Sequence, residues 1–259
     1  MELTADGVVA VVDLDAGGRL ASLCVHGHEL LVTDRADGVY GWGCYPMVPW
    51  AGRVRRGRFR FQDTEVALPL GMPPHAIHGV GVESAWIRTG PTELACDLRD
   101  PWPFGGRALQ RLDLDGDRLV LGLSVEAEQA MPAMVGWHPW FRRRLDGGGP
   151  VELDFVPDAM LTRDDDGIQT GATVPPPPGP WDDCFSGVRQ PVGLAWPDVL
   201  AVQLRSSCAF WVVYTEPDHA ACVEPQSGPP DSFNQTPRVV EPGAPLTHWF
   251  EIRWSRGEE

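Results

Sequence analysis

The chain has 259 residues, of which 43% are hydrophobic and 22% charged, so it is long enough to bury a substantial core and unsuited to wholesale disorder. Its 36 acidic residues outnumber the 21 basic residues, all of which are Arg, and the formal net charge is −15. This balance argues against a nucleic-acid or anionic-membrane partner, because such partners need a basic surface. The lack of Lys excludes catalysis through a lysine Schiff base.

The first residues of the chain and the spacing of its cysteines indicate in which cellular compartment the protein is expected. The first seven residues have neither the basic nor the apolar segment of a signal peptide. No run without Asp, Glu, Arg or His is longer than 38–52, which is interrupted by Gly and Pro and is too short for a membrane-spanning helix. The six cysteines are scattered without a Cys-x-x-Cys pair, which favours reduced, packed thiols. We therefore expect a soluble cytoplasmic protein, monomeric or homodimeric, with no nucleic-acid or membrane partner.

Alternating apolar and polar residues predict short β-strands along most of the chain. Residues 8–14 alternate and lead to a Gly-Gly turn, and residues 58–61 and 65–68 flank a polar turn as in a hairpin. The clearest hairpin spans 109–125, where two alternating segments flank a turn at Asp115-Gly116-Asp117. Three later segments also predict strands: 151–155, 209–215 and 247–254.

Turn-forming residues are frequent, with 29 Gly and 26 Pro, and no segment has the pattern of an amphipathic helix of three turns. The one low-complexity tract, Pro175 to Pro178, is interpreted as a rigid crossing between two strands rather than a domain linker, because strand patterning resumes on both sides. The sequence therefore predicts an all-β chain, residues 1–259, folded as a single large antiparallel β-sandwich domain.

Five short segments concentrate polar and aromatic residues that can carry chemistry: 50–60, which contains five Arg, 75–79, 136–141, 181–185 and 224–226. Each also has a structural interpretation. Arg at alternate positions is typical of a solvated strand face, and a histidine between aromatic residues is often a packed core residue. His75-x-x-His78 has metal-ligand spacing, but no third ligand with distinctive spacing accompanies it, so no metal is expected.

Tryptophan favours a carbohydrate site over these structural interpretations. Four of the 11 Trp residues lie within three positions of a candidate polar group: Trp50 near Arg53, Trp137 and Trp140 near His138, and Trp181 beside Asp182. Sugars present hydroxyls to charged side chains and C–H faces to aromatic planes, so carbohydrate sites combine these two kinds of group. The sequence thus predicts a small-molecule monosaccharide as the partner.

In order and spacing, these segments resemble the motifs of the aldose 1-epimerase (galactose mutarotase) family from about Trp50 to Glu224. Five stretches carry the resemblance: Gly52-Arg53 with Gly57-Arg58-Phe59 (family Asn-Arg and a Gly-x-Phe hairpin), Ile77-His78-Gly79-Val80 (Leu-His-Gly-Gly), Gly136-Trp137-His138-Pro139-Trp140-Phe141 (Gly-His-His-Pro-Tyr-Phe), Asp182 ahead of Phe185 (a sugar-binding Asp before an aromatic residue), and Glu224-Pro225-Gln226 (Glu-Pro-Gln). Each motif alone is weak, but five in the same order are a specific signal. Three positions depart from the family pattern: Gly52, Val80 and Trp137.

The resemblance implies a galactose mutarotase-like supersandwich and a cofactor-free isomerase that interconverts the α and β anomers of a hexose. It assigns Glu224 as the base and His138 as the acid, and a carboxylate with an imidazole is the pair most easily tuned towards neutral pH. The three departures from the family pattern do not affect the residues assigned to catalysis, so the reaction type is still expected, but they leave the identity of the sugar undetermined. The residues expected to bind the sugar are Arg53, His78, Asp182, Trp140 and Trp50.

Other functions are compatible with parts of this pattern. The Arg cluster would suit a hexose-6-phosphate or other anionic-hexose epimerase, in which Arg53, Arg55 or Arg56 binds the anion. A non-catalytic carbohydrate-binding protein would need the Trp and Asp residues without the acid and base. A glycoside hydrolase normally needs two carboxylates flanking the bond, whereas the best pair here is one Glu and one His.

Overall fold

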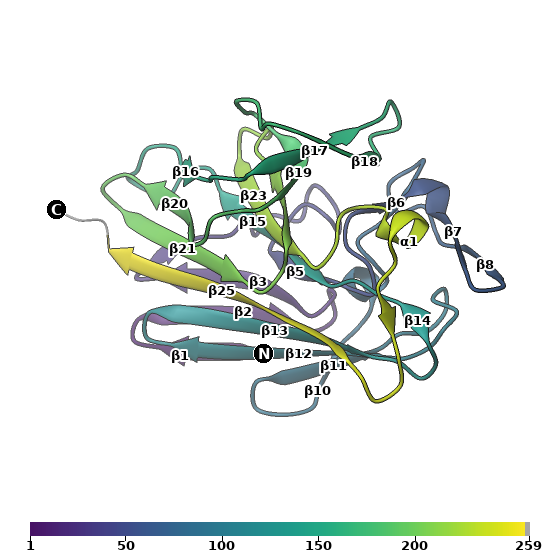
Figure 1. Ribbon diagram of the computed structural model, residues 1–259. Coiled ribbons are helices and arrows are strands. Elements are labelled where there is room, and N and C mark those ends of the chain that lie inside the picture. The colour runs from purple at the N-terminus through teal and green to yellow at the C-terminus, as the bar shows by residue number, and fades with distance from the viewer. Residues whose placement is uncertain (257–259) are drawn as a thin grey trace.

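The computed structural model describes residues 1–256, nearly all of them in strands, turns and loops (Figure 1). Eleven strands form the larger sheet: β1 (Glu2–Ala5), β2 (Val8–Asp13), β3 (Arg19–Val25), β4 (His28–Glu29), β5 (Cys44–Met47), β15 (Gly136–Arg142), β17 (Ala159–Arg163), β18 (Gln169–Val174), β19 (Asp182–Ser186), β22 (Phe210–Tyr214) and β23 (Ala220–Gln226). Eight strands form the smaller sheet: β10 (Ile87–Arg88), β11 (Glu93–Asp97), β12 (Arg107–Asp115), β13 (Arg118–Glu126), β16 (Glu152–Asp154), β20 (Val192–Trp196), β21 (Leu200–Ser206) and β25 (Leu246–Arg256).

Short elements complete the described part of the chain. Three two-stranded ribbons pair β6 (Arg53–Val54) with β9 (Ala76–Ile77), β7 (Arg58–Phe61) with β8 (Thr64–Ala67), and β14 (Met131–Pro132) with β24 (Val239–Val240). The helical segments are η1 (Arg55–Gly57), η2 (Gly81–Glu83) and α1 (Ser232–Gln235). Within residues 1–256, no helix is long and apolar enough to span a bilayer.

Both large sheets are antiparallel throughout their paired strands. The larger sheet runs in the order β1-β2-β3-β5-β15-β23-β22-β19-β17-β18, with β4 paired to β3. The smaller sheet runs in the order β10-β11-β12-β13-β25-β21-β20-β16, and its long strands β12, β13 and β25 lie side by side across the lower part of Figure 1. The predicted all-β antiparallel sandwich is confirmed.

The strand patterns explain which faces are buried. In β13, Leu119, Leu121, Leu123 and Val125 are buried and alternate with residues that are partly exposed. β13 pairs with β12 from the Asp115 end of the hairpin onward, which confirms the hairpin expected at 109–125 and extends it to 107–126. The hairpin expected near residues 58–68 is also present, as β7 and β8.

Aromatic side chains fill the space between the two sheets. Trp137 of β15 packs on Phe250 of β25 with ring centroids 5.9 Å apart, and Phe141 lies 6.4 Å from Trp196 of β20. Buried side chains of both sheets belong to one continuous hydrophobic cluster. One face of β15 is therefore committed to the core, which leaves its opposite face free to carry a site.

Two smaller expectations concern the proline tract and the cysteines. Pro175 to Pro178 lies between β18 and β19, which both pair with β17, so the tract is a crossing within one sheet. All six cysteines are free thiols and five of them are buried, which agrees with packed thiols.

Candidate active site

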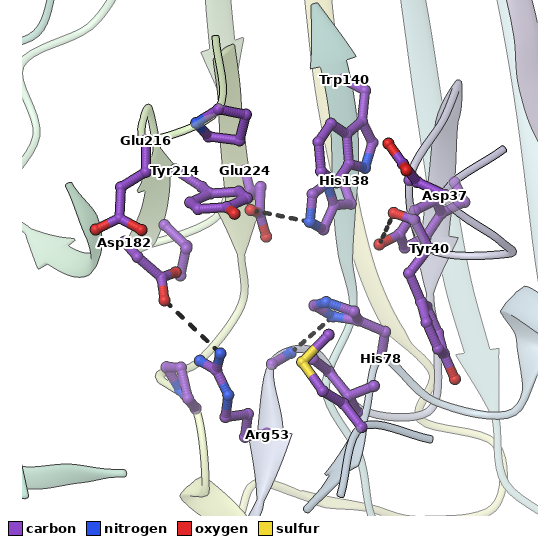
Figure 2. Close-up of a pocket in the computed structure, with 18 of the residues that line it drawn as sticks. Asp37, Tyr40, Arg53, His78, His138, Trp140, Asp182, Tyr214, Glu216 and Glu224 are labelled. Atoms are coloured by element: carbon purple, nitrogen blue, oxygen red, sulfur yellow. Dashed lines mark hydrogen bonds and ion pairs between the residues drawn. The ribbon is translucent and has the colours of Figure 1, made fainter. Parts of the chain in front are cut away.

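A cavity of about 540 Å³ lies over the face of the 11-stranded sheet that points away from the core (Figure 2). Its floor is formed by β15 and β23, and the ribbon of β6 and β9 borders it on one side. Six of the residues predicted to form the site line this cavity: Arg53, His78, His138, Trp140, Asp182 and Glu224.

Strand geometry explains why the two catalytic candidates meet. The antiparallel register of β15 and β23 sets His138 directly opposite Glu224, and the register of β5 sets Tyr45 opposite His138 on its other side. Side chains alternate along β15, so His138 and Trp140 face the cavity while Trp137 faces the core. Glu224 and His138 are more than 80 residues apart in sequence, and the sheet alone makes them neighbours.

The two side chains form a close and almost fully buried pair. His138 Nε2 lies 3.2 Å from Glu224 Oε1, and the two residues are only 5% and 2% exposed. Burial disfavours the charged form of each group, so it raises the pKa of Glu224 well above its ordinary value and lowers the pKa of His138 to about 3. Both shifts favour the uncharged pair, a protonated Glu224 beside a neutral His138, and transfer of that one proton to His138 yields a free carboxylate base and a protonated imidazole acid.

His138 is held by aromatic stacking. Its ring lies 4.9 Å from that of Tyr45, at an interplanar angle of 28°, and 5.2 Å from that of Trp140, at 10°. Its Nδ1 atom is buried and has no hydrogen-bond partner. Stacking with these two rings sets the plane of the imidazole, and the cross-strand pairing directs Nε2 at Glu224.

His78 enters the cavity from the loop that follows β9. Its Nδ1 accepts a hydrogen bond of 3.3 Å from the Gly52 N–H, so the neutral ring carries its proton on Nε2. Burial keeps the pKa of His78 well below its ordinary value, which maintains this neutral form. The local backbone explains the next residue: Gly79 has φ +82°, and a Cβ there would lie 2.0 Å from the Val48 carbonyl oxygen.

Asp182 forms the opposite wall of the cavity, at the start of β19. Its Oδ2 lies 3.7 Å from Arg53 Nη2 and 3.2 Å from Arg163 Nη1, and about a quarter of the side chain is exposed. Tyr214 stands beside it across the β19–β22 pairing, and Glu216 lies at the same side of the cavity in Figure 2. This wall presents both hydrogen-bond donors and acceptors, as a ligand with several hydroxyl groups requires.

The three departures from the family motifs are placed differently. Trp137 is fully buried in the core, on the opposite face of β15 from the cavity. Val80 borders a separate, smaller cavity. Only Gly52 lines the main cavity, where it has φ +69° and where a Cβ would lie 2.9 Å from the Pro230 ring. Of the three, Gly52 is therefore the departure in direct reach of a ligand.

Trp50, which was expected to contact the sugar, does not line the main cavity. It is 2% exposed, and its ring packs 5.9 Å from that of Trp102 in the hydrophobic cluster. Trp50 and Arg53 are close in sequence, but one lies in the core and the other lines the cavity, because the side chains of an extended segment point in different directions. Trp140 is the predicted tryptophan that does line the cavity.

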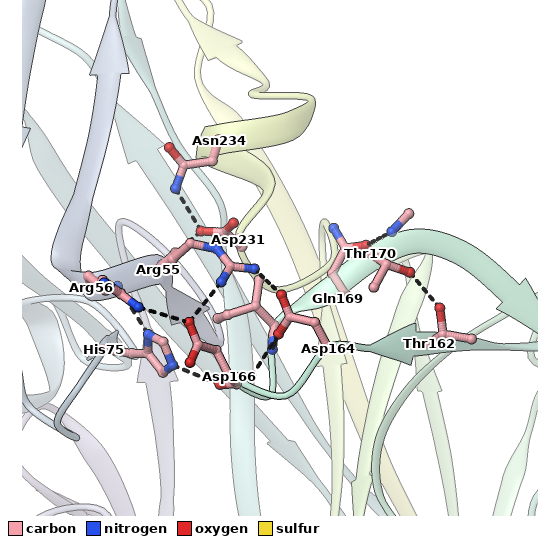
Figure 3. Close-up of polar contacts among 12 residues, drawn as sticks. Arg55, Arg56, His75, Thr162, Asp164, Asp166, Gln169, Thr170, Asp231 and Asn234 are labelled. Carbon is pink, nitrogen blue, oxygen red and sulfur yellow. Dashed lines mark hydrogen bonds and ion pairs between the residues drawn. The ribbon is translucent and has the colours of Figure 1, made fainter.

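Arg55 and Arg56 lie outside the main cavity, in a network that we call the surface clamp: Arg55, Arg56, His75, Asp164 and Asp166 (Figure 3). The Arg55 guanidinium donates to Asp164 and, over 3.1 Å, to Asp166. His75 Nδ1 accepts from the Arg56 N–H over 3.0 Å, and Nε2 donates to the Asp166 carbonyl over 2.8 Å. Both nitrogens of His75 are thus occupied, so His75-x-x-His78 is not a ligand pair. The clamp ties the β17–β18 turn to η1 and to His75, the residue just before β9.

Several cavity residues were missed by sequence reasoning. They include Tyr40, Tyr45, Tyr214 and Glu216, and with them Gln226, which belongs to a motif but was given no role in the site. For Gln226 a signal existed, because residues two apart on a strand share a face and Glu224 was already a candidate. Tyr45 had no such signal, since its position beside His138 depends on the β5–β15 register alone.

Comparison with known proteins agrees with this architecture. The aldose 1-epimerase family model matches residues 1–253. Two solved structures cover 98% of the chain: a putative aldose 1-epimerase from Escherichia coli K12, with a TM-score of 0.84, 20% identity and 98% of its own chain covered, and a galactose mutarotase-like protein from Clostridium acetobutylicum, with a TM-score of 0.85, 16% identity and 94% covered. At these identities they show a shared fold.

Curated relatives match over part of their length. An uncharacterized protein of Escherichia coli K12 is 30% identical over 135 residues, which is 49% of this chain and 47% of the relative. The galactose mutarotase of Mus musculus is 26% identical over 137 residues, 48% of this chain and 40% of the relative. The matched region thus spans less than half of each relative. The family model, in contrast, matches nearly the whole chain, and the protein belongs to the aldose 1-epimerase family.

Proposed function

We propose that this protein is an aldose 1-epimerase that interconverts the α and β anomers of a neutral hexose by acid–base catalysis. The observation that carries the proposal is the buried contact of 3.2 Å between His138 Nε2 and Glu224 Oε1 on the cavity floor. Family membership and the resemblance to a mouse galactose mutarotase support the reaction class.

The reaction needs one proton removed and one delivered. In ring opening, the pair reacts in the form that carries its one proton on His138: Glu224 takes the proton of the C1 hydroxyl, protonated His138 gives its proton to the ring oxygen, the C1–O5 bond breaks, and the open-chain aldehyde forms. Rotation about C1–C2 exposes the other face of the aldehyde, and closure reverses both transfers. The pair holds one proton before and after each step, so it titrates as a unit. Each transfer is worth on the order of 10²–10⁴-fold in rate.

The surrounding residues would hold the sugar in register. His78 presents its Nε2–H, and Arg53 its guanidinium, as donors to the sugar oxygens, while Asp182 accepts from hydroxyls at the far wall. Trp140, stacked on His138, lines the cavity and supplies apolar surface beside the sugar. Positioning of this kind lowers the barrier because the reacting groups meet in one orientation.

The placement of the arginines favours a neutral over a phosphorylated hexose. Arg53 is the one arginine among the described residues that line the main cavity, and Asp182 lies 3.7 Å from it. Arg55 and Arg56 are engaged with the clamp carboxylates, at 3.1 and 3.4 Å from Asp166. The cavity is bordered by more carboxylates than guanidinium groups, which disfavours a dianion.

Anomer exchange followed by one-dimensional NMR tests the proposal on a panel of neutral hexoses and hexose 6-phosphates. We expect acceleration with at least one neutral hexose and a weaker effect with its 6-phosphate. Glu224→Gln should abolish the acceleration, since the amide cannot take up the C1 proton. Binding of sugars without any acceleration by the wild-type protein would instead identify a carbohydrate-binding protein.

A matched control for Glu224→Gln is Glu29→Gln. Glu29 lies on β4 outside the main cavity, and its Oε1 accepts from the backbone N–H groups of Leu23 and Leu31 at 3.0 and 2.9 Å. The same chemical change there should lower stability and leave kcat near that of the wild type. Loss of activity in both variants would point to general unfolding.

A further inference from the structure

Gln226 is a neighbour of Glu224 on the same strand of the cavity floor. It follows Glu224 by two positions on β23, so both side chains leave the same face of the sheet. Gln226 lines the main cavity and is 0% exposed. A polar side chain buried to this extent needs a partner for each of its hydrogen-bonding groups.

One end of the Gln226 amide is used by Glu224. Its Nε2 donates to Glu224 Oε2 over 3.3 Å, while Glu224 Oε1 faces His138. The two carboxylate oxygens thus have separate partners. This orientation of the amide is the favourable one, because the reverse would place its carbonyl oxygen against the carboxylate. The donated hydrogen bond opposes the effect of burial by lowering the pKa of Glu224.

The other end of the amide has no partner in the protein. Gln226 Oε1 is buried and accepts no hydrogen bond. A buried acceptor without a donor is unfavourable, and it is tolerated where a ligand can supply the donor. A sugar hydroxyl is such a donor, and Gln226 is next to the base that must reach the C1 hydroxyl.

We propose that Gln226 is a positioning residue for the base: its amide N–H donates to Glu224 Oε2 and so fixes the carboxylate with Oε1 beside His138, and its carbonyl oxygen accepts from a hydroxyl of the bound sugar. The proposal rests on the proposed epimerase function and adds a residue to its machinery. Gln226 transfers no proton itself.

The test compares Gln226→Met with Gln110→Met. Methionine keeps the approximate length of the side chain and removes both the donor and the acceptor. Gln110 is a matched control because it is 3% exposed, and its Nε2 donates over 2.7 Å to the Gly18 carbonyl, away from the main cavity. Each variant loses one buried amide hydrogen bond, so both should have a lower melting temperature than the wild type.

We expect Gln226→Met to lower kcat about ten- to hundredfold and to raise KM several-fold, because a hydrogen bond to a charged group is lost together with a sugar contact. Gln110→Met should leave both constants near the wild-type values. Gln226→Asn, which keeps the amide but shortens its reach, should change the constants in the same direction as Gln226→Met and serves if the methionine variant folds poorly.

An NMR titration of the ¹³C-labelled Glu224 carboxyl group separates this proposal from the proposed function, because it needs no activity. The pKa of Glu224 should rise in Gln226→Met relative to the wild type and stay unchanged in Gln110→Met, since only Gln226 donates to the carboxylate. An unchanged titration of Glu224 would overturn the positioning role even in an active enzyme. A lower kcat with an unchanged KM would overturn the sugar contact.

Discussion

The cavity floor and the surface clamp are both clusters of ionisable side chains, yet they differ in burial and in hydrogen bonding. On the floor, His138 and Glu224 are at most 5% exposed, and His138 Nδ1 has no partner. In the clamp, Arg55 and both of its carboxylate partners are about 36% exposed, and both nitrogens of His75 are hydrogen-bonded. Both clusters contain charges that the sequence analysis had singled out, but only one is left with unmet hydrogen-bonding capacity.

This difference separates a site from a structural contact. A buried polar group without a partner costs stability, so a fold keeps it where a ligand or a reaction uses it. A solvated ion-pair network changes the free energy of unfolding only slightly, and its role here is to connect two segments of the chain. The clamp holds the β17–β18 turn against the segment that carries Arg53 and His78, and so it supports the cavity from outside.

The largest expected effect is on the floor itself. His138→Gln removes the acid and should lower kcat by on the order of 10²–10⁴-fold, because the ring oxygen then receives its proton only from water. Stopped-flow polarimetry on freshly dissolved α-glucose, or on whichever hexose the panel identifies, measures the change. Wild-type activity in a correctly folded variant would remove His138 from the mechanism.

An arginine pair sharpens the comparison further. Arg53→Gln should raise KM roughly tenfold, because a charged donor to the sugar is lost. Arg55→Gln should leave KM and kcat near the wild-type values, since the Arg55 guanidinium lies in the clamp. Its effect should be on stability, below about 1 kcal/mol, as is usual for exposed ion pairs. Equal effects of the two substitutions on KM would contradict the division between cavity and clamp.

The pH dependence of stability should also report on the floor. The pKa of His138 falls from 6.5 to about 3 on folding, so between these values the unfolded chain binds more protons than the folded one. The corresponding stability is complete above pH 6.5 and is lost as the pH falls towards 3. Urea denaturation at pH 7 and pH 4.5 should show that wild type loses roughly 1–3 kcal/mol more than His138→Gln over this interval. A parallel loss in both proteins would mean that His138 is not buried in its neutral form.

Much of the fold could be predicted because the long strands of the eight-stranded sheet alternate between buried and partly exposed residues. The hairpin of β12 and β13 is readable from Leu119, Leu121 and Leu123 alone, since each strand has one buried and one partly exposed face. The central strands β15 and β23 were harder to assign. Almost every residue in them is buried, with the core on one face and the cavity floor on the other, so the alternation of a strand with one solvent-facing side is absent.

The candidate site was predicted from the order of its motifs, and the structure then sorted its members. Six predicted residues line one cavity, whereas Trp50 packs against Trp102 in the core. Tyr45 joins the cavity through strand register, which spacing in the sequence does not encode, whereas Gln226 shares a strand face with Glu224 because the two are two positions apart.

The sequence by itself determined the strand-rich composition and the family motifs, because both are written in residue types and local spacing. It also supplied the two residues with the chemistry for proton transfer, Glu224 and His138. Only the tertiary structure decided that they meet at 3.2 Å, that burial moves their pKa values in opposite directions, and that Arg55 belongs to a clamp outside the cavity. These properties depend on register and burial, and both arise when strands far apart in the chain pair within one sheet.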